Sequence, residues 1–409
     1  MQEINTIIKI AWRNVWRNKL RSTIVISAIA LGLWAGLFVM SLVLGLNEQR
    51  MNGAVNSYLS HLQIHNPKYL ENPKLKYSLQ EVKEAIKFLG KDSRIKAFSK
   101  RVSSTGMAAS SAGNQGINIL GIDPEQEKKV TNISDKIVEG KYFTTGKQNS
   151  VVVGQRLAKK LKLKLKSKLL ITFQDIDKNI ISIQFKVRGI YKTGSTIFDE
   201  FNIFVRKQAL TQHLGIGIAT HEIVALCNRI EFAEPVSKEL HKILKKDLSQ
   251  TWVEISPELG YAQEMMSQVV YIFMLIILLA LSFSIINTML MAVLERKKEI
   301  GMLMSIGMNK KNLFSMIAFE TTFIVLVATP IGMLSAYFTI TYFSKNGIDL
   351  SVVAEGLGSL GVGAFVFPFL PGNLYVNITL LTLLVAFFSS LFPARRALKL
   401  NPSEAVRSL

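Results

Sequence analysis

ERKKEIGMLMSIGMNKK, residues 295–311, is a charged and helix-forming segment that separates two long apolar runs. A helical run of about 20 apolar residues is long enough to cross the roughly 30 Å of hydrocarbon in a bilayer. The runs on either side, 265–294 and 321–344, contain no charged side chain, so we expect both to cross a membrane. The charged segment between them then forms a short loop at one membrane surface.

Two further uncharged runs, 22–46 and 374–394, meet the same length requirement. Across its 409 residues the chain is 49% hydrophobic and carries a net charge of +20, so apolar and basic residues must be segregated along it. The first run is too long for a signal-peptide core and is expected to be retained. The sequence therefore predicts an α-helical membrane protein with four transmembrane helices and a large α+β extracytoplasmic domain inserted between helices 1 and 2.

The distribution of Lys and Arg predicts the orientation of these helices. Basic residues lie before the first run, between the second and third, and after the fourth, whereas the loop between the third and fourth contains only Lys345. Cytoplasmic loops are enriched in Lys and Arg, and long translocated domains escape this rule. Both termini and the loop 295–311 are therefore expected in the cytoplasm, with residues 47–264 outside.

The first 21 residues have the pattern of a helix that lies on a membrane surface. Ile7, Ala11, Trp12, Val15 and Trp16 recur at helical spacing, and basic residues take the other face. The alternative is a merely positive flank of the first membrane helix.

The segment between the first two apolar runs alternates between strand and helix patterns. Strands are predicted at 61–65, 116–122, 150–153, 169–173, 180–190, 201–205 and 251–255, and helices at 79–89 and 235–248. This order predicts one subdomain in two segments that flank an inserted β-rich subdomain. The single cysteine, Cys227, has no intrachain partner, so the outer domain must be held by its own core.

We expect the chain to divide into an interfacial amphipathic helix (1–21), a first membrane helix with a stalk (22–57), the first half of a periplasmic subdomain (58–119), the inserted β-rich subdomain (120–210), the second half of the periplasmic subdomain (211–256), a stalk with the second membrane helix (257–294), a cytoplasmic loop or helix (295–311), a third membrane helix (312–344), an extracytoplasmic loop (345–373), a fourth membrane helix (374–394) and a cytoplasmic tail (395–409).

No catalytic or cofactor-binding motif is evident. Gly146-Lys147 lacks the spacing of a phosphate-binding loop, His61 and His65 have no acidic or Cys neighbours that suggest a metal site, and no GxSxG setting occurs. A non-catalytic chain without metal, cofactor or nucleic-acid partner is the expectation.

Two intramembrane features have more than one interpretation. Glu320, at the edge of the third span, is either paired, for which Lys310 and Lys311 are candidates, or an interfacial carboxylate in contact with water. Gly332 and Ala336 have the small-xxx-small spacing of close helix packing, either within the subunit or across a dimer.

The charged loop also carries a family resemblance. Glu295 to Met308 with Glu320 resembles the R-x-x-E-I-G signature of permeases that include the lipoprotein-releasing subunits (LolC/LolE type), MacB-type efflux pumps and the cell-division permease FtsX. The ending is similar to the same family's P-A-R-R-A…P-h-E-A-L-R motif, through Pro393, Arg395, Arg396, Pro402 and Arg407. The order of one helix, a large outer domain and three helices also fits.

The resemblance implies a type VII ABC transporter permease of the bacterial inner membrane that works by mechanotransmission. It implies a dimeric cytoplasmic ABC ATPase that binds ATP and Mg²⁺ on its own chain, and a second permease that is an identical copy or a paralogue. The residues that contact the ATPase would be Glu295, Arg296, Lys297, Lys298, Glu299, Ile300, Gly301, Met302, Ser305, Ile306 and Gly307.

The resemblance is nearest to the lipoprotein-releasing branch, which implies an acylated protein substrate, contact with membrane lipids and a periplasmic lipoprotein carrier. Depth and apolar bulk suggest that a lipid-binding V is lined by Leu37, Met40, Leu44, Val269, Phe273 and Ile276; ordinary lipid-facing or helix-packing surface is the alternative. Alternative functions are an FtsX-like signalling permease that regulates a cell-wall hydrolase, and MacB-like tripartite efflux of a peptide or antibiotic.

Overall fold

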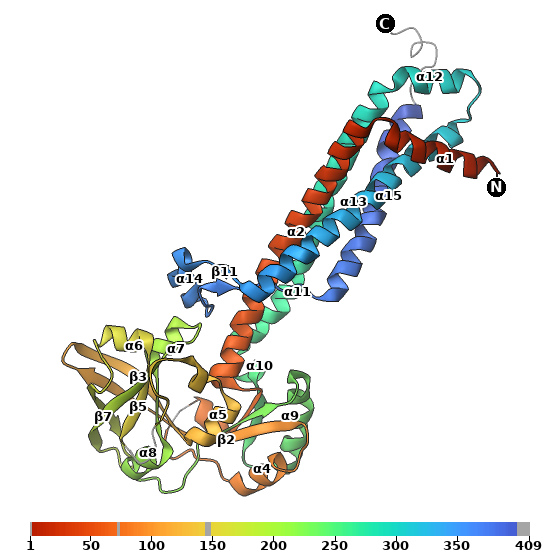
Figure 1. The fold of residues 1–409 in the computed structure, drawn as a ribbon. Coiled ribbons are helices and arrows are strands. Elements are labelled where there is room, and N and C mark those ends of the chain that lie inside the picture. The colour runs from red at the N-terminus through yellow and green to blue at the C-terminus, as the bar shows by residue number, and fades with distance from the viewer. Residues whose placement is uncertain (1, 72–73, 144–148, 399–409) are drawn as a thin grey trace. The chain divides into compact units, whose positions relative to one another are not determined.

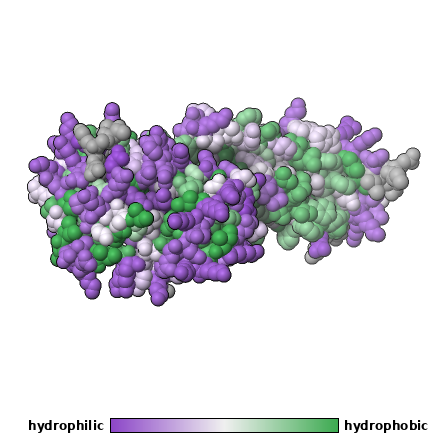
Figure 2. All heavy atoms as spheres, turned by 90° about the horizontal axis from the view of Figure 1, so that it is seen from below, coloured by the Kyte–Doolittle hydropathy of each residue, from purple (hydrophilic) through white to green (hydrophobic). Residues whose placement is uncertain are grey.

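The computed structural model describes residues 2–71, 74–143 and 149–398, and it divides into two compact units. The first unit contains residues 1–46, 264–348 and 367–409, and the second contains 47–263 and 349–366. Figure 2 shows hydrophilic residues over most of the face that the folded sheets present, and hydrophobic residues along the long helices. Apolar surface is thus concentrated where the sequence predicted membrane helices.

The first unit is built from helices (Figure 1), two of which continue into the second unit: α1 (Gln2–Arg17), α2 (Lys19–Ala54), α11 (Pro257–Glu295), α12 (Lys297–Ser305), α13 (Lys310–Asn346) and α15 (Gly372–Leu398). Among the described residues, four helical segments are long and apolar enough to cross a membrane: Lys19–Leu59, Pro257–Glu295, Lys310–Asn346 and Gly372–Leu398. These four coincide with the four predicted spans.

Close packing of α2 on α13 depends on one small residue. A Cβ atom added to Gly332 would lie 2.8 Å from the carbonyl oxygen of Ala30 and 3.0 Å from the Cβ of Leu33. Ala336, one turn later, is fully buried. The small-xxx-small pair therefore serves packing within this chain, and of the two alternatives from the sequence the first holds.

The amphipathic helix α1 packs on the other helices of its unit. Ile7, Ala11 and Val15 are buried, and the Trp12 ring contacts Phe323 of α13 with 5.4 Å between centroids. Trp12 and Trp16 each keep 42% of their surface exposed. The apolar stripe that suggested a surface helix is thus largely used for contacts inside the protein, and the two Trp rings remain available to an interface.

The second unit is an α+β domain. Its strands are β1 (Leu62–His65), β2 (Ile95–Ser110), β3 (Gly113–Ile122), β4 (Ile137–Gly140), β5 (Ser150–Gly154), β6 (Lys168–Gln174), β7 (Ile180–Tyr191), β8 (Asn202–Arg206), β9 (Glu222–Cys227) and β10 (Leu248–Thr251). Its helices are η1 (Val55–Leu59), α3 (Pro67–Glu71), α4 (Val82–Leu89), α5 (Pro124–Val130), η2 (Ile133–Lys136), α6 (Gln155–Lys160), α7 (Thr196–Phe201), α8 (Lys207–Leu214), η3 (Ile230–Phe232), α9 (Ala233–Ile243) and α10 (Trp252–Ile255). The loop between α13 and α15 adds β11 (Ile348–Asp349), η4 (Ser351–Val353), α14 (Ala354–Ser359) and β12 (Phe365–Val366).

Strand β2 belongs to both sheets of this unit. Its first half pairs with β9 in an antiparallel sheet of order β10-β1-β9-β2, whose core includes side chains from α4 and α9. Its second half pairs with β3 and β6, and the pairing continues through β8, β5 and β7 back to β6. This ring of six strands closes on itself, which leaves no free edge among them.

The ring gives the inserted subdomain a different start from the predicted residue 120. Because β2 and β3 both pair inside the ring, its first strand begins near residue 102 and its last, β8, ends at Arg206. The strand predicted at 251–255 is also wrong. The Thr251 hydroxyl and the Glu254 carboxylate form a capping box there, so residues 252–255 turn into the short helix α10.

One buried arginine connects several elements of the second unit. Arg101 of β2 is 2% exposed, and its guanidinium binds the Glu127 carboxylate of α5 at 2.6 Å and the Glu222 carboxylate of β9 at 3.0 Å. It also donates to the carbonyl oxygen of Tyr58 in η1 at 2.8 Å. Burial of a charge is tolerated only with such complete pairing.

Replacement of Arg101 by Met should lower the free energy of unfolding of the second unit by about 3–5 kcal/mol, because the buried carboxylate of Glu127 and the partly buried carboxylate of Glu222 lose their counter-ion. Differential scanning calorimetry measures this as a lower melting temperature. Arg229→Met is the matched control, since the Arg229–Glu231 pair is exposed and should contribute less than about 1 kcal/mol. Equal effects of the two changes would contradict the role of Arg101.

The Asp199 carboxyl of α7 provides a pH-dependent test. Burial raises the pKa of Asp199 to about 6, although Thr193 donates hydrogen bonds to it from its amide and its hydroxyl. The unfolded chain would release this proton near pH 3.9, so the folded state holds the proton more tightly between about pH 4 and pH 6. Stability from this group is therefore lost as the pH rises through that window.

Asp199→Asn removes this titration. Relative to the variant, the wild-type protein should lose roughly 2–3 kcal/mol of stability between about pH 4 and pH 7. Melting temperatures measured for both proteins across that range provide the comparison. A constant difference between them would show that Asp199 does not titrate in this window.

Candidate functional site

Helix α12 is connected to α11 and to α13 by short turns, and particular residues interrupt the helical conformation at each of them. Arg296 interrupts the helical conformation after α11 ends at Glu295, and α12 starts at the next residue. At its other end Gly307 has φ +98°, a conformation that glycine adopts without strain. The Asn309 side chain then accepts a hydrogen bond from the Lys311 amide at 3.2 Å and caps α13.

The two faces of α12 differ in chemistry. Ile300 and Gly301 are buried against the neighbouring helices. On the opposite face Met302 is 58% exposed and Ile306, in the turn after the helix, is 78% exposed, with Lys298 and Ser305 also exposed. Positions 298, 302 and 305 or 306 follow helical spacing and lie on one face. The outer face therefore presents two large apolar side chains beside a cation.

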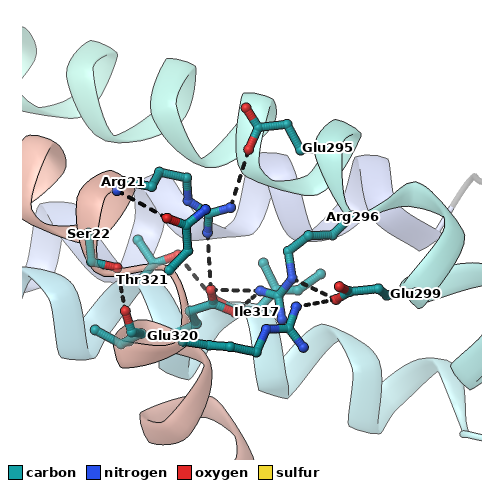
Figure 3. Close-up of polar contacts among 11 residues, drawn as sticks. Arg21, Ser22, Glu295, Arg296, Glu299, Ile317, Glu320 and Thr321 are labelled. Atoms are coloured by element: carbon teal, nitrogen blue, oxygen red, sulfur yellow. Dashed lines mark hydrogen bonds and ion pairs between the residues drawn. The ribbon is translucent and has the colours of Figure 1, made fainter.

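A buried carboxylate anchors this region. The Glu320 side chain of α13 is 3% exposed, and Arg296 Nη1 donates to its two oxygens at 2.9 and 3.0 Å. Arg21 Nη2 of α2 approaches the same carboxylate at 3.4 Å (Figure 3). Glu320 thus connects α2, α13 and the junction of α11 with α12.

The network extends outward from Glu320. Glu299 of α12 accepts hydrogen bonds from Arg17 and, at 3.0 Å, from Arg296 Nε, and the two guanidinium groups hold the pKa of Glu299 below its ordinary value. Arg21 also lies 3.6 Å from Glu295. The network contains three guanidinium groups and three carboxylates, so its charges balance: Arg17, Arg21, Arg296, Glu295, Glu299 and Glu320.

The geometry favours a mechanical role over a ligand site. The cavity beside Glu320, lined by α11, α12 and α13, has a volume of about 20 Å³, which is room for one water molecule. Removing one partner of a buried pair is costly, whereas the exposed pairs at the rim contribute little. The Glu320–Arg296 pair should therefore dominate the attachment of α12.

These contacts decide between the two interpretations of Glu320. The carboxylate is paired, but its partners are Arg296 and Arg21, while Lys310 and Lys311 are exposed. Sequence reasoning missed both arginines as partners of Glu320. Arg21 immediately precedes the apolar run 22–46, and Glu320 immediately precedes the run 321–344. Both residues are therefore expected at the same membrane surface, and this shared position could have identified Arg21 as a partner of Glu320.

The structure places the other candidate residues as follows. Leu37 and Met40 are buried among the chain's own helices, Leu44, Val269 and Phe273 are half-buried, and Ile276 is 56% exposed. Packing within the chain accounts for Leu37 and Met40 without a ligand. Lining of a lipid site by the other four stays a prediction.

The tail motif lies partly in the structure. Pro393 is buried inside α15, and Arg395 and Arg396 are exposed in its last turn. Pro402 and Arg407 lie outside the described residues.

Replacement of Glu320 by Gln should loosen α12, because two arginines lose a buried counter-ion. Hydrogen–deuterium exchange of residues 297–305 is expected to accelerate at least about tenfold, which corresponds to roughly 1.4 kcal/mol. Glu295→Gln removes an exposed partner of the same network and should change exchange little. Unchanged exchange in Glu320→Gln would exclude the anchoring role.

Two family models match the chain. The MacB-like periplasmic core domain matches residues 22–243, and the FtsX-like permease C-terminal domain matches residues 271–402. Together they cover most of the outer unit, helices α12, α13 and α15, and four residues of the charge network: Glu295, Arg296, Glu299 and Glu320.

Two transmembrane subunits of lipoprotein-releasing systems match nearly the full length of the chain, and an ABC transporter permease matches about half of it. The chain is 22% identical to the lipoprotein-releasing system transmembrane protein LolC of Neisseria meningitidis, over 93% of this chain and 92% of the relative. It is 23% identical to LolE of Haemophilus influenzae, over 99% of this chain and 100% of the relative. It is also 28% identical to the ABC transporter permease MJ1507 of Methanocaldococcus jannaschii, over 55% of each chain. The chain therefore belongs to the family of ABC transporter permeases that combine a MacB-like periplasmic core domain with an FtsX-like C-terminal domain.

Proposed function

We propose that this chain is the membrane subunit of an ABC transporter that extracts lipoproteins from the bacterial inner membrane for delivery toward the outer membrane. A separate ATPase, which binds ATP and Mg²⁺, would supply the energy. The observation that carries the mechanism is the exposed face of α12, fixed to α2 and α13 through Glu320. Similarity to LolC and LolE along nearly the whole chain supports the choice of substrate.

The exposed face of α12 is suited to bind an ATPase in the cytoplasm. The side chains of Met302 and Ile306 form an exposed apolar patch on α12 and the turn after it. Exposed apolar patches beside polar residues are typical of protein interaction sites. Lys298 and the ion-paired rim add charge for orientation. Interfaces of this kind gain most of their affinity from a few buried apolar side chains at the centre.

A displacement of α12 would be transmitted to α2 and α13, because direct ion pairs connect the three helices. Arg296 connects α12 to Glu320, and Glu320 connects to Arg21 near the start of α2. Helix α2 then continues without interruption to Ala54, and α11 runs from Pro257 to Glu295. Two long helices that share residues with the outer unit would carry a displacement from the cytoplasmic loop to the periplasm.

The acylated substrate and a second permease would contact the exposed side of α11. Ile276 belongs to an apolar stripe that the described chain leaves uncovered, together with Ile272, Leu279 and Phe283. Leu44, Val269 and Phe273 are the remaining candidates for lining a lipid site. A periplasmic carrier would then receive the lipoprotein.

The double change Met302→Asp with Ile306→Asp should weaken ATPase binding by at least about tenfold, since burial of each apolar side chain contributes roughly 1.5–3 kcal/mol. Biolayer interferometry on the chain in nanodiscs measures this affinity. Val138→Asp, at a comparably exposed apolar residue of β4, is the control and should leave ATPase affinity unchanged. Wild-type affinity in the double variant would remove α12 as the docking site.

The substrate is tested by purifying the chain with its ATPase in nanodiscs and identifying bound molecules by mass spectrometry. Triacylated peptides or lipoproteins that dissociate on addition of ATP are the expected result. A bound hydrolase activator would instead indicate the signalling alternative, and an efflux adaptor the tripartite one. Either of these would overturn lipoprotein extraction while the ATPase-docking role of α12 remained.

A further inference from the structure

The outer unit contains a pocket that the proposed transport mechanism does not use. It has a volume of about 450 Å³, within the range of small-molecule sites. Lysine and arginine side chains predominate among its charged lining residues: Lys100, Arg206 and Lys207, with Asp123 as the single carboxylate among the residues that line it.

The pocket forms where two parallel strands end side by side. Strands β3 and β8 are parallel, and Ile122 at the end of β3 pairs with Arg206 at the end of β8. Each strand is followed at once by a helix, α5 after β3 and α8 after β8. The first turns of both helices therefore contribute residues to the same pocket.

The two helix starts differ in how they are capped. Asp123 places its carboxylate on α5, where it accepts hydrogen bonds from the amides of Glu125 at 3.1 Å and Gln126 at 3.4 Å. At the start of α8 the corresponding residue is Arg206, which supplies no side-chain cap. The positive end of α8 thus lacks the negative charge that the neighbouring helix has.

Two ammonium groups line this pocket, and Asp123 is the one carboxylate among the lining residues. Lys207 Nζ donates to the Thr220 hydroxyl at 2.8 Å, and among the described residues neither Lys207 nor Lys100 forms an ion pair. Burial, and next the neighbouring Lys100 charge, lowers the pKa of Lys207 to about 8. Like charges placed together in a partly buried pocket are unfavourable unless an anion joins them.

We propose that this pocket binds a phosphate-type oxyanion, held by the ammonium groups of Lys100 and Lys207 and by the first-turn amides of α8. Two ammonium groups and a helix start match a dianion better than a monovalent carboxylate. The volume also leaves space for a group attached to the phosphate. The anion is either phosphate in solution or the headgroup of an anionic phospholipid.

Amine labelling of Lys207 tests the proposal on the full chain. The chain in phosphatidylcholine nanodiscs is acetylated with a limiting reagent near pH 8, in chloride or in inorganic phosphate of equal ionic strength, and again in phosphatidylglycerol nanodiscs with chloride. Peptide mass spectrometry gives the rate at each lysine. An anion that raises the pKa of Lys207 by about one unit should slow its labelling about five- to tenfold.

Protection by inorganic phosphate identifies the soluble ion, and protection only with phosphatidylglycerol identifies the headgroup. The exposed Lys129 of α5 serves as the internal reference and should label at the same rate throughout. Equal labelling of Lys207 under all three conditions would overturn the proposal.

Two variants separate a specific site from general screening. Gln208→Glu places a carboxylate in the first turn of α8, which favours the helix and should abolish protection by the anion. Lys100→Gln should raise the half-protecting concentration about tenfold. Lys129→Gln is the matched control and should keep wild-type protection. Protection that persists in Gln208→Glu would show that the anion binds elsewhere.

Discussion

The carboxylate of Glu320 is the constraint on which the helical unit depends. It is 3% exposed on a helix long and apolar enough for a membrane, where an unpaired charge is very costly. Its need for a partner is met by Arg296, the residue that separates α11 from α12, and by Arg21 at the start of α2. The direction of α12 is thereby fixed by electrostatics as well as by the buried Ile300 and Gly301, and its apolar outer face remains available.

The outer unit also contains a buried ion group at a junction of several elements, with the signs of the charges reversed. Arg101 is a buried cation that two carboxylates neutralise, whereas Glu320 is a buried anion that two arginines neutralise. In both cases the partners come from segments distant in sequence, and the ion group lies where several elements meet. A buried pair adds little net stability compared with apolar packing, but separating its partners leaves an uncompensated buried charge and is strongly destabilising. Such junctions are appropriate where helices must keep a defined relation while the protein works.

The sequence predicted the features that rest on local pattern. Uncharged apolar runs identified the four long helices, and strand-like sequence patterns identified β1, β3, β5, β6, β7 and β8. Strand β2 was missed because Ser103–Gly106 and Ala108–Ser110 are small or polar, although the strand joins both sheets. Three features depend on contacts between segments distant in sequence: the closure of the ring of strands, the partners of Glu320, and the burial of Leu37 and Met40. The periodicity of apolar residues along one sequence does not predict such contacts.

The oxyanion pocket shows why such sites escape sequence reading. Its parts come from β2, from the ends of β3 and β8 and from the turn before β9, and none of them carries a recognisable phosphate motif. What relates them is the parallel pairing of β3 with β8, which sets two helix starts next to each other. One start has its own carboxylate in Asp123 and the other has Lys207, so the difference between two otherwise similar strand–helix junctions is one of charge. An anion bound at α8 would make the second junction electrostatically equivalent to the first.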